Sequence, residues 1–79
     1  MKERIEGMNR AREILGDMLA LKAIQEPEDR TEIIILFKAY KAVAETLIEA
    51  VDAYAPDLAD YCAEARRQLA EMEAAACGI

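Results

Sequence analysis

The sequence has 79 residues, of which ten are basic and sixteen acidic, with no histidine and a net charge of −6. An acidic chain repels phosphate backbones, so we expect no direct binding of nucleic acid, and a basic protein would be the better electrostatic partner. No stretch approaches the ~20 apolar residues of a membrane span, and the alternating charges of residues 1–6 lack the apolar core of a signal peptide, so we expect a cytoplasmic protein without a membrane partner.

We expect a single all-helical domain over residues 1–79. Sixteen alanines, together with many Leu, Glu, Lys and Arg residues, favour helix, and turn-forming residues cluster in two places. A chain of this length buries only about 60% of the surface that its unfolded state exposes. Its own core is therefore small, and a partner would stabilise it.

The first predicted helix covers about residues 2–25. Its apolar residues recur at steps of three and four, the helical period, and we expect the resulting stripe to face the core. Gly7 and Gly16 each weaken this helix by about 1 kcal/mol relative to alanine. Each glycine either allows a neighbouring backbone to approach closely or simply lies on the surface. The stripe consists of Ile5, Met8, Ala11, Leu15, Met18 and Leu19, and is widened by Ile14, Leu21 and Ile24.

The second predicted helix covers about residues 29–54. Pro27 disfavours helix in the residue before it, and Asp29 followed by Glu32 has the form of a capping box. The apolar residues that follow form a heptad-like seam, and at this spacing we interpret its tyrosines as core rather than as a ligand-binding surface. One column of the seam is Phe37, Ala44, Val51, Leu58 and Ala65, and the other is Ile33, Tyr40, Leu47, Tyr54 and Tyr61.

Pro56 lies on the face opposite this seam, so it either kinks one long helix or starts a new one. We favour a break, because Pro56 followed by Asp57 suits a helix start in conformation and in dipole. A third helix then covers about residues 57–76, with Gly78 as a C-terminal cap. The predicted fold class is therefore all-α, a small three-helix unit that dimerises. A helical hairpin with a kinked long helix is the alternative.

Residues 33–37 are five consecutive apolar residues, which in a helix cover its whole circumference. Two of the five belong to the seam, Ile34 and Leu36 flank it, and Ile35 points away from it. The chain has no further helix to cover Ile35, so we expect this side chain to be exposed unless a partner covers it. A β-strand is the competing interpretation, because the run is β-branched, but no second strand is present to pair with it.

The sequence lacks the residues that most catalytic chemistry needs. It contains no histidine and no serine, and neither Thr31 nor Thr46 has an evident base, so we predict no catalytic residue. Glu45, Glu49 and Asp52 share one helix face, but such spacings arise readily among sixteen acidic residues. We interpret them as a solvated face and predict no metal site and no cofactor.

Cys62 and Cys77 lie fifteen residues apart in the third predicted helix. This spacing corresponds to roughly 22 Å, which is beyond the reach of a disulfide. Two distant thiols also cannot form a tetrahedral zinc site. We interpret both as small apolar fillers, and two unpaired thiols favour a reducing compartment.

These observations predict a non-enzymatic protein–protein interaction module, a small acidic regulator or adaptor that forms a homodimer through its second helix. The apolar run supplies three candidate interaction residues, Ile34, Ile35 and Leu36. The acidic excess lies in residues 27–79, so the electrostatic contacts with a basic partner are expected there. The acidic candidates are Glu45, Glu49, Asp52, Asp57, Asp60 and Glu64.

The alternative function is that of a small acidic inhibitor that blocks the basic groove of a nucleic-acid-binding protein. In its size, charge and helix content the chain is similar in character to phage anti-defence, anti-CRISPR and DNA-mimic proteins. The two functions differ in their response to salt. An adaptor that binds through apolar residues tolerates salt, whereas the association of an acidic inhibitor weakens as salt is added.

Overall fold

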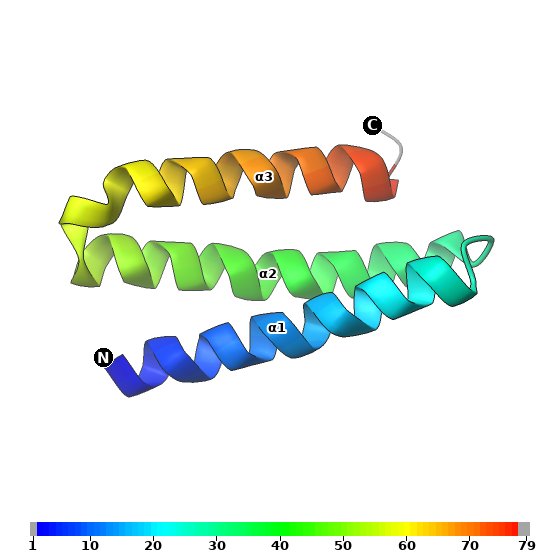
Figure 1. Cartoon of the computed structure of the whole chain (residues 1–79), viewed down its shortest axis with the longest axis horizontal. Helices are drawn as coiled ribbons and strands as arrows, with labels where there is room; N and C mark the ends of the chain where they lie inside the picture. Colours follow the sequence, from blue (N-terminus) through cyan, green and yellow to red (C-terminus); the bar gives the residue numbers. More distant parts are fainter. Residues whose placement is uncertain (1, 78–79) are drawn as a thin grey trace.

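A computed structural model of the chain describes residues 2–77, which form three helices joined by short connections (Figure 1). The helices are α1 (Lys2–Gln25), α2 (Arg30–Tyr54) and α3 (Ala59–Cys77), and a 3₁₀ turn, η1 (Pro56–Leu58), precedes α3. The prediction of a small all-α unit with three helices is confirmed. Residues 33–37 lie within α2 and residues 2–77 contain no strand, so the strand interpretation was wrong.

The three helices lie side by side in a flat layer with α2 in the middle (Figure 1). Both α1 and α3 run antiparallel to α2, and the described part of the chain measures 41 × 24 × 15 Å. Each outer helix packs on α2, but no Cα atom of α1 comes within 8 Å of one in α3. The core is therefore a line of contacts along α2, not the closed centre of a bundle.

The turn between α1 and α2 is held by local polar contacts. Asp29 caps α2, because its carboxylate accepts a hydrogen bond from the backbone N–H of Glu32 at 3.3 Å, as the sequence predicts. Lys22 forms ion pairs with Glu26 at 2.8 Å and with Asp29 at 3.2 Å. These contacts fix the start of α2 one residue beyond the cap.

The predicted break at Pro56 is confirmed. Helix α2 ends at Tyr54, and Ala55 leaves the helical region with φ −136° and ψ 75°. Pro56 then occupies the first position of η1, where its missing N–H costs nothing. The chain reverses direction here, which excludes a single kinked helix. The predicted cap at Gly78 lies outside the described residues.

The core lies where α2 faces both neighbours. Phe37 is completely buried and contributes with Leu19 from α1 and Leu69 from α3 to one cluster. The half-buried side chains of Ile33, Leu36, Tyr40 and Ala76 pack against this cluster. Cys62 is also buried, with its Sγ 4.0 Å from the backbone oxygen of Ile48, so it fills space as predicted.

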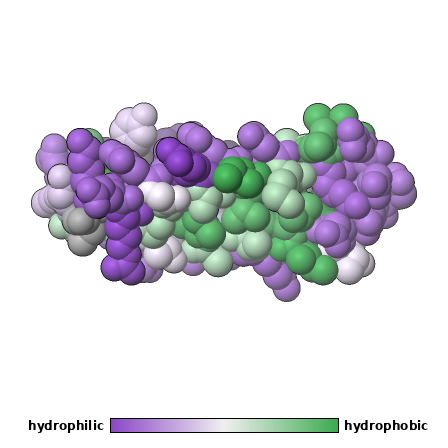
Figure 2. All heavy atoms as spheres, turned by 90° about the horizontal axis from the view of Figure 1, so that it is seen from below, coloured by the Kyte–Doolittle hydropathy of each residue, from purple (hydrophilic) through white to green (hydrophobic). Residues whose placement is uncertain are grey.

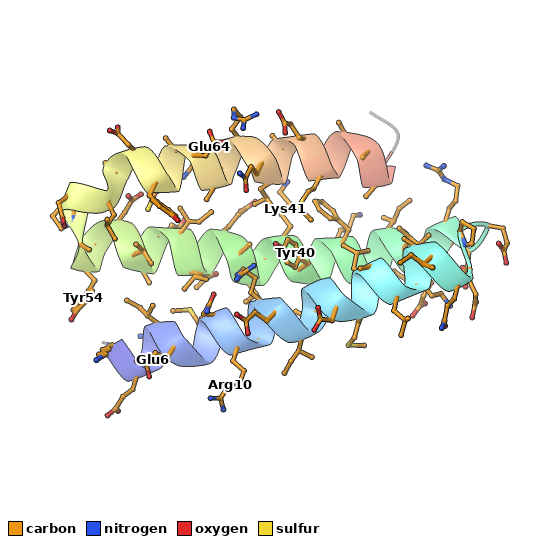
Figure 3. The ribbon with its side chains drawn as sticks, in the orientation of Figure 1. Glu6, Arg10, Tyr40, Lys41, Tyr54 and Glu64 are labelled. Carbon is orange, nitrogen blue, oxygen red and sulfur yellow. The ribbon has the colours of Figure 1, made fainter. Side chains whose placement is uncertain are left out.

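The core interpretation of the seam tyrosines was wrong at the end of α2 and in α3. Tyr54 is 56% exposed and Tyr61 79% exposed, and Figure 3 shows Tyr54 pointing away from α2 at the corner. The seam interpretation fails because the chain reverses direction at Ala55. Heptad positions after this residue lie on another helix, so they no longer face the same neighbouring helix. In α3 the residues that face α2 are instead Cys62 and Leu69.

The apolar stripe predicted for α1 is also split between two sides of the helix. Leu15 is half-buried and Leu19 buried, whereas Ile14, Met18 and Leu21 are about half exposed. The reason is that α1 has only α2 as a neighbour, and one neighbour covers one side of a helix.

The two glycines of α1 have different surroundings. A Cβ atom added at Gly16 would lie 3.3 Å from Cε2 of Tyr40, so this glycine makes room for the tyrosine ring. A Cβ atom added at Gly7 would have no heavy atom within 4 Å. Gly16 therefore serves packing within the chain, and Gly7 is a surface glycine.

Candidate protein-binding surfaces

The first candidate surface is the outer stripe of α1, which we define as Ile14, Met18 and Leu21. These residues follow the i, i+4, i+7 spacing of a helix face, and their exposed fractions are 54%, 49% and 54%. Figure 2 views the molecule from the α1 side and shows apolar residues over the middle and toward the loop end, with hydrophilic residues at both extremities. Such an apolar face on a small helical unit is typical of an interaction site.

Ile35 lies at about the same position along the helix axes as one end of this stripe. Helices α1 and α2 are antiparallel and Gly16 lies level with Tyr40, so Leu21 lies level with Ile35. Ile35 is 55% exposed, whereas Ile34 and Leu36 are half-buried. Of the three apolar residues predicted for binding, Ile35 therefore offers the most surface.

The second candidate surface is a trough on the opposite face of α2, between α1 and α3. At the loop end its floor is Ile33 and Phe37, and this part has a volume of about 460 Å³. Met72 also lines the next hollow along α2, and Gln68 links that hollow to a third one at the corner end. The walls at the loop end consist mostly of small residues, namely Gly16, Ala20 and Ala23 from α1 and Ala75 and Ala76 from α3.

Two arginines line this trough between α1 and α3. Arg30 lies at the loop end and Arg12 near the middle. The third hollow, at the corner, is lined by α3 residues alone, and these include Asp60 and Glu64. The charged residues of the trough itself are therefore basic.

The acidic residues predicted for binding do not form one face. Glu45 and Asp52 lie at the α2–α3 contact, where Glu45 pairs with Lys41 at 3.7 Å and Asp52 pairs with Arg66. Glu64 pairs with Arg67 within α3. Ion pairs thus partly neutralise three of the six candidates. Among the ion pairs of residues 2–77, none involves Glu49, Asp57 or Asp60.

Two ion pairs join α2 to α3, Lys41–Glu73 and Asp52–Arg66. Figure 3 shows Lys41 between these helices, where its Nζ lies 2.7 Å from the carboxylate of Glu73. The hydrogen bond to Glu73 raises the pKa of Lys41. The hydrogen bond from Arg66, followed by one from Cys62, lowers the pKa of Asp52. Burial raises the pKa of the Cys62 thiol, as does the adjacent Asp52, so the thiol stays protonated at neutral pH.

Neither a metal centre nor a transmembrane helix is evident in the described part of the chain. Within residues 2–77, no three Cys, Asp or Glu side chains come together as a metal site. None of the helices described here is long and apolar enough to cross a membrane. Comparison of the chain with protein-family models, curated proteins and solved structures finds no match.

The sequence interpretation missed both the outer stripe as a separate surface and the trough. The stripe had a signal, because α1 carries two apolar lines, one through Leu15 and Leu19 and the other through Ile14, Met18 and Leu21. The sequence indicates the trough more weakly, through the small residues of α1 and α3 that line it. Its existence depends on where the outer helices lie around α2, which helical periodicity does not specify.

Proposed function

We propose that this protein is a non-enzymatic protein-binding module and that one of its partners is a second copy of itself. The observation that carries the proposal is the apolar surface formed by the outer stripe of α1 and Ile35. Few small monomers leave large apolar side chains exposed at consecutive turns of a helix. A second copy would cover them without any change in the fold.

The total exposed area supports the same proposal. A folded monomer of 8.8 kDa is expected to expose roughly 4,800 Å², whereas this chain exposes 5529 Å². The difference, about 700 Å², is close to the ~800 Å² that each partner buries in a typical specific interface. In a dimer with a two-fold axis, both copies would bury the same surface.

The charge distribution also favours contact through α1. Residues 1–26 contain five basic and five acidic side chains, so the net charge of −6 lies in the rest of the chain. Two copies that meet mainly through α1 bring together regions whose net charge is zero and keep the acidic regions farther apart. Repulsion between the acidic regions is then weakened by distance and by salt.

Light scattering coupled to size exclusion tests this proposal. We expect a dimer at about 100 µM, well above the micromolar dissociation constants of weak complexes. Ile35→Glu and Leu21→Glu place a charge in the contact and should give monomers of unchanged helix content by circular dichroism. Ala74→Glu adds the same charge to an exposed position of α3 and should leave the dimer intact.

A monomeric wild-type protein at this concentration would refute self-association. Loss of the dimer in Ala74→Glu as well would show that net charge, and not the apolar surface, controls association. If Ile35→Glu unfolds the chain, Leu21→Glu provides the same test from the other helix.

The acidic-inhibitor function has less support. Its six candidates separate into two groups, with Glu45, Glu49 and Asp52 at the α2–α3 contact and Asp57, Asp60 and Glu64 at the corner. A mimic of nucleic acid would need regularly spaced, unpaired carboxylates along one face. The corner group is the part of the acidic surface that is best placed to attract a basic partner.

A further inference from the structure

Gly7 has no evident purpose in the fold of a single chain. Glycine in the interior of a helix is destabilising relative to alanine, and Gly7 lies within α1. A Cβ atom added at Gly7 would have no heavy atom within 4 Å, whereas one added at Gly16 would meet the Tyr40 ring. Packing within the chain therefore accounts for Gly16 but not for Gly7. A contact with another molecule would make use of the missing side chain.

Gly7 lies in line with the outer stripe of α1. Gly7, Ile14 and Leu21 are exposed and follow one another at steps of seven residues, a spacing that keeps them on one face of a helix. Ile14 lies near the middle of α1, with the glycine on one side and the leucine at the same distance on the other. A second copy of α1 that runs antiparallel and is centred on Ile14 therefore places each Leu21 opposite the Gly7 of the other copy.

The charges on one flank of this line favour the same arrangement. Arg10 lies four residues before Ile14 and Asp17 three residues after it, so they share a flank. Both are exposed, neither belongs to an ion pair within residues 2–77, and Figure 3 shows Arg10 pointing away from α2. In an antiparallel contact Arg10 of each copy lies beside Asp17 of the other, whereas a parallel contact would bring like charges together.

The opposite flank of α1 carries Arg4 and Lys22, whose positive charges approach each other in the antiparallel arrangement. Lys22 already forms ion pairs with Glu26 at 2.8 Å and with Asp29 at 3.2 Å. These carboxylates offset its charge, so the repulsion from Arg4 is weak. The charges of the two flanks together therefore favour the antiparallel contact.

We propose that the α1 helices of two copies pack antiparallel about a two-fold axis at Ile14. In this arrangement Gly7 is the hollow that receives Leu21 of the other copy, and the contacts between Arg10 and Asp17 set the direction of the two helices. The inference rests on the proposed self-association and adds the register and the residues that determine it. The two copies of α1 overlap over their whole length, because Ile14 lies near the middle of the helix.

An exchange of the two charges tests the direction of the helices. The dissociation constant of the full-length dimer is measured by sedimentation equilibrium in about 0.05 M NaCl, where charges are weakly screened. Arg10→Glu and Asp17→Lys should each raise this constant by about tenfold, because each turns two attractive contacts into repulsive ones. The variant with both substitutions restores two opposite-charge contacts and should dissociate within about threefold of the wild type.

Two controls separate this effect from net charge. Asp60→Lys makes the same charge change at an exposed position of α3 and should not weaken the dimer. In 1 M NaCl the differences between the two single variants and the wild type should become small, because salt screens exposed charges.

Gly7→Leu tests the hollow. Leucine favours helix, so the helix content by circular dichroism should not fall, but its side chain occupies the space that Leu21 of the other copy needs. We expect the dissociation constant to rise by about tenfold or more, as for other overpacked contacts. Ala74→Leu adds the same side chain to an exposed position of α3 and should leave the constant unchanged.

The outcomes distinguish this arrangement from self-association itself. A dimeric wild type in which the double charge variant stays as weak as the single ones would overturn the antiparallel register and leave self-association standing. Unchanged or tighter association of Gly7→Leu would do the same, because a filled hollow could not then be part of the contact. A monomeric wild type would refute self-association and this inference together.

Discussion

Helices α1 and α3 are attached to the same central helix in different ways. Among the described residues, α1 and α2 share no ion pair, and their contact consists of apolar side chains such as Leu19 and the ring of Tyr40 over Gly16. Helices α3 and α2 share the Lys41–Glu73 and Asp52–Arg66 ion pairs in addition to Leu69 and Cys62.

This difference shows how a small chain holds two helices with one core. Apolar contact does not depend on direction and tolerates small shifts, so α1 can keep a second apolar stripe free for another protein. Ion pairs depend on distance and orientation. They therefore fix the position of α3 along α2 where there is little apolar surface to do so.

The largest effect is expected from Phe37→Ala, because this side chain belongs to the cluster that joins all three helices. Removal of a fully buried phenylalanine costs about 3–5 kcal/mol, which is comparable to the whole stability of a domain of this size. We expect loss of cooperative unfolding in thermal circular dichroism. Tyr61→Ala, at an exposed position, should change stability by no more than about 0.5 kcal/mol, and a similar loss in both variants would show that the core lies elsewhere.

Leu19→Ala and Leu69→Ala separate the two attachments. Each removes a buried leucine and should cost about 2–5 kcal/mol. Since salt screens ion pairs, 1 M NaCl should destabilise Leu69→Ala further relative to Leu19→Ala. Urea unfolding of both variants at low and high salt measures this difference. If salt acts equally on the two variants, the ion pairs contribute nothing to holding α3.

The two glycines of α1 test how tightly α1 packs on α2. Gly7→Ala should stabilise the protein by about 0.5–1 kcal/mol, because alanine restricts the unfolded chain and meets no neighbour. Gly16→Ala gains the same helix propensity but presses on Tyr40, so its stability should be lower than that of Gly7→Ala. Thermal melting of the two variants provides the comparison. A larger gain at Gly16 would mean that the Tyr40 ring moves aside freely.

The smallest effect is expected from Asp52→Asn, which removes one exposed ion pair between α2 and α3. Because Arg66 lowers the pKa of Asp52, its contribution to stability is present above the ordinary value of 3.8 and is lost as pH falls below it. The melting temperature of the variant should be slightly below that of the wild type at pH 7. The difference should disappear in strong acid. A difference that persists there would have to come from packing and not from charge.

Helical periodicity was sufficient to predict the helices, because their ends are set by local chemistry. Asp29 caps α2 and Pro56 starts the turn that follows it, and both effects depend on residues adjacent in sequence. The exposure of Ile35 was also predictable, because two neighbouring helices cannot cover a helical segment that is apolar on every side.

The arrangement of the helices around α2 was not predictable from periodicity. The tyrosines of the seam illustrate this, because Tyr40 packs against the core while Tyr61, in the same column, is exposed. Their difference comes from the chain reversal at Ala55, which changes the helix that each one faces. The outer stripe and the trough follow from the same long-range geometry.

The separation of the backbones of α1 and α3 has a consequence for local unfolding. The two outer helices share only the central side-chain cluster, so each can detach from α2 while the remaining hairpin keeps most of its own contacts. Native-state hydrogen exchange should therefore reveal two separate opening events, one for the amides of α1 and one for those of α3. Amides in the middle of α2 should exchange only when both hairpins are lost, which makes the central helix the most protected segment of the chain.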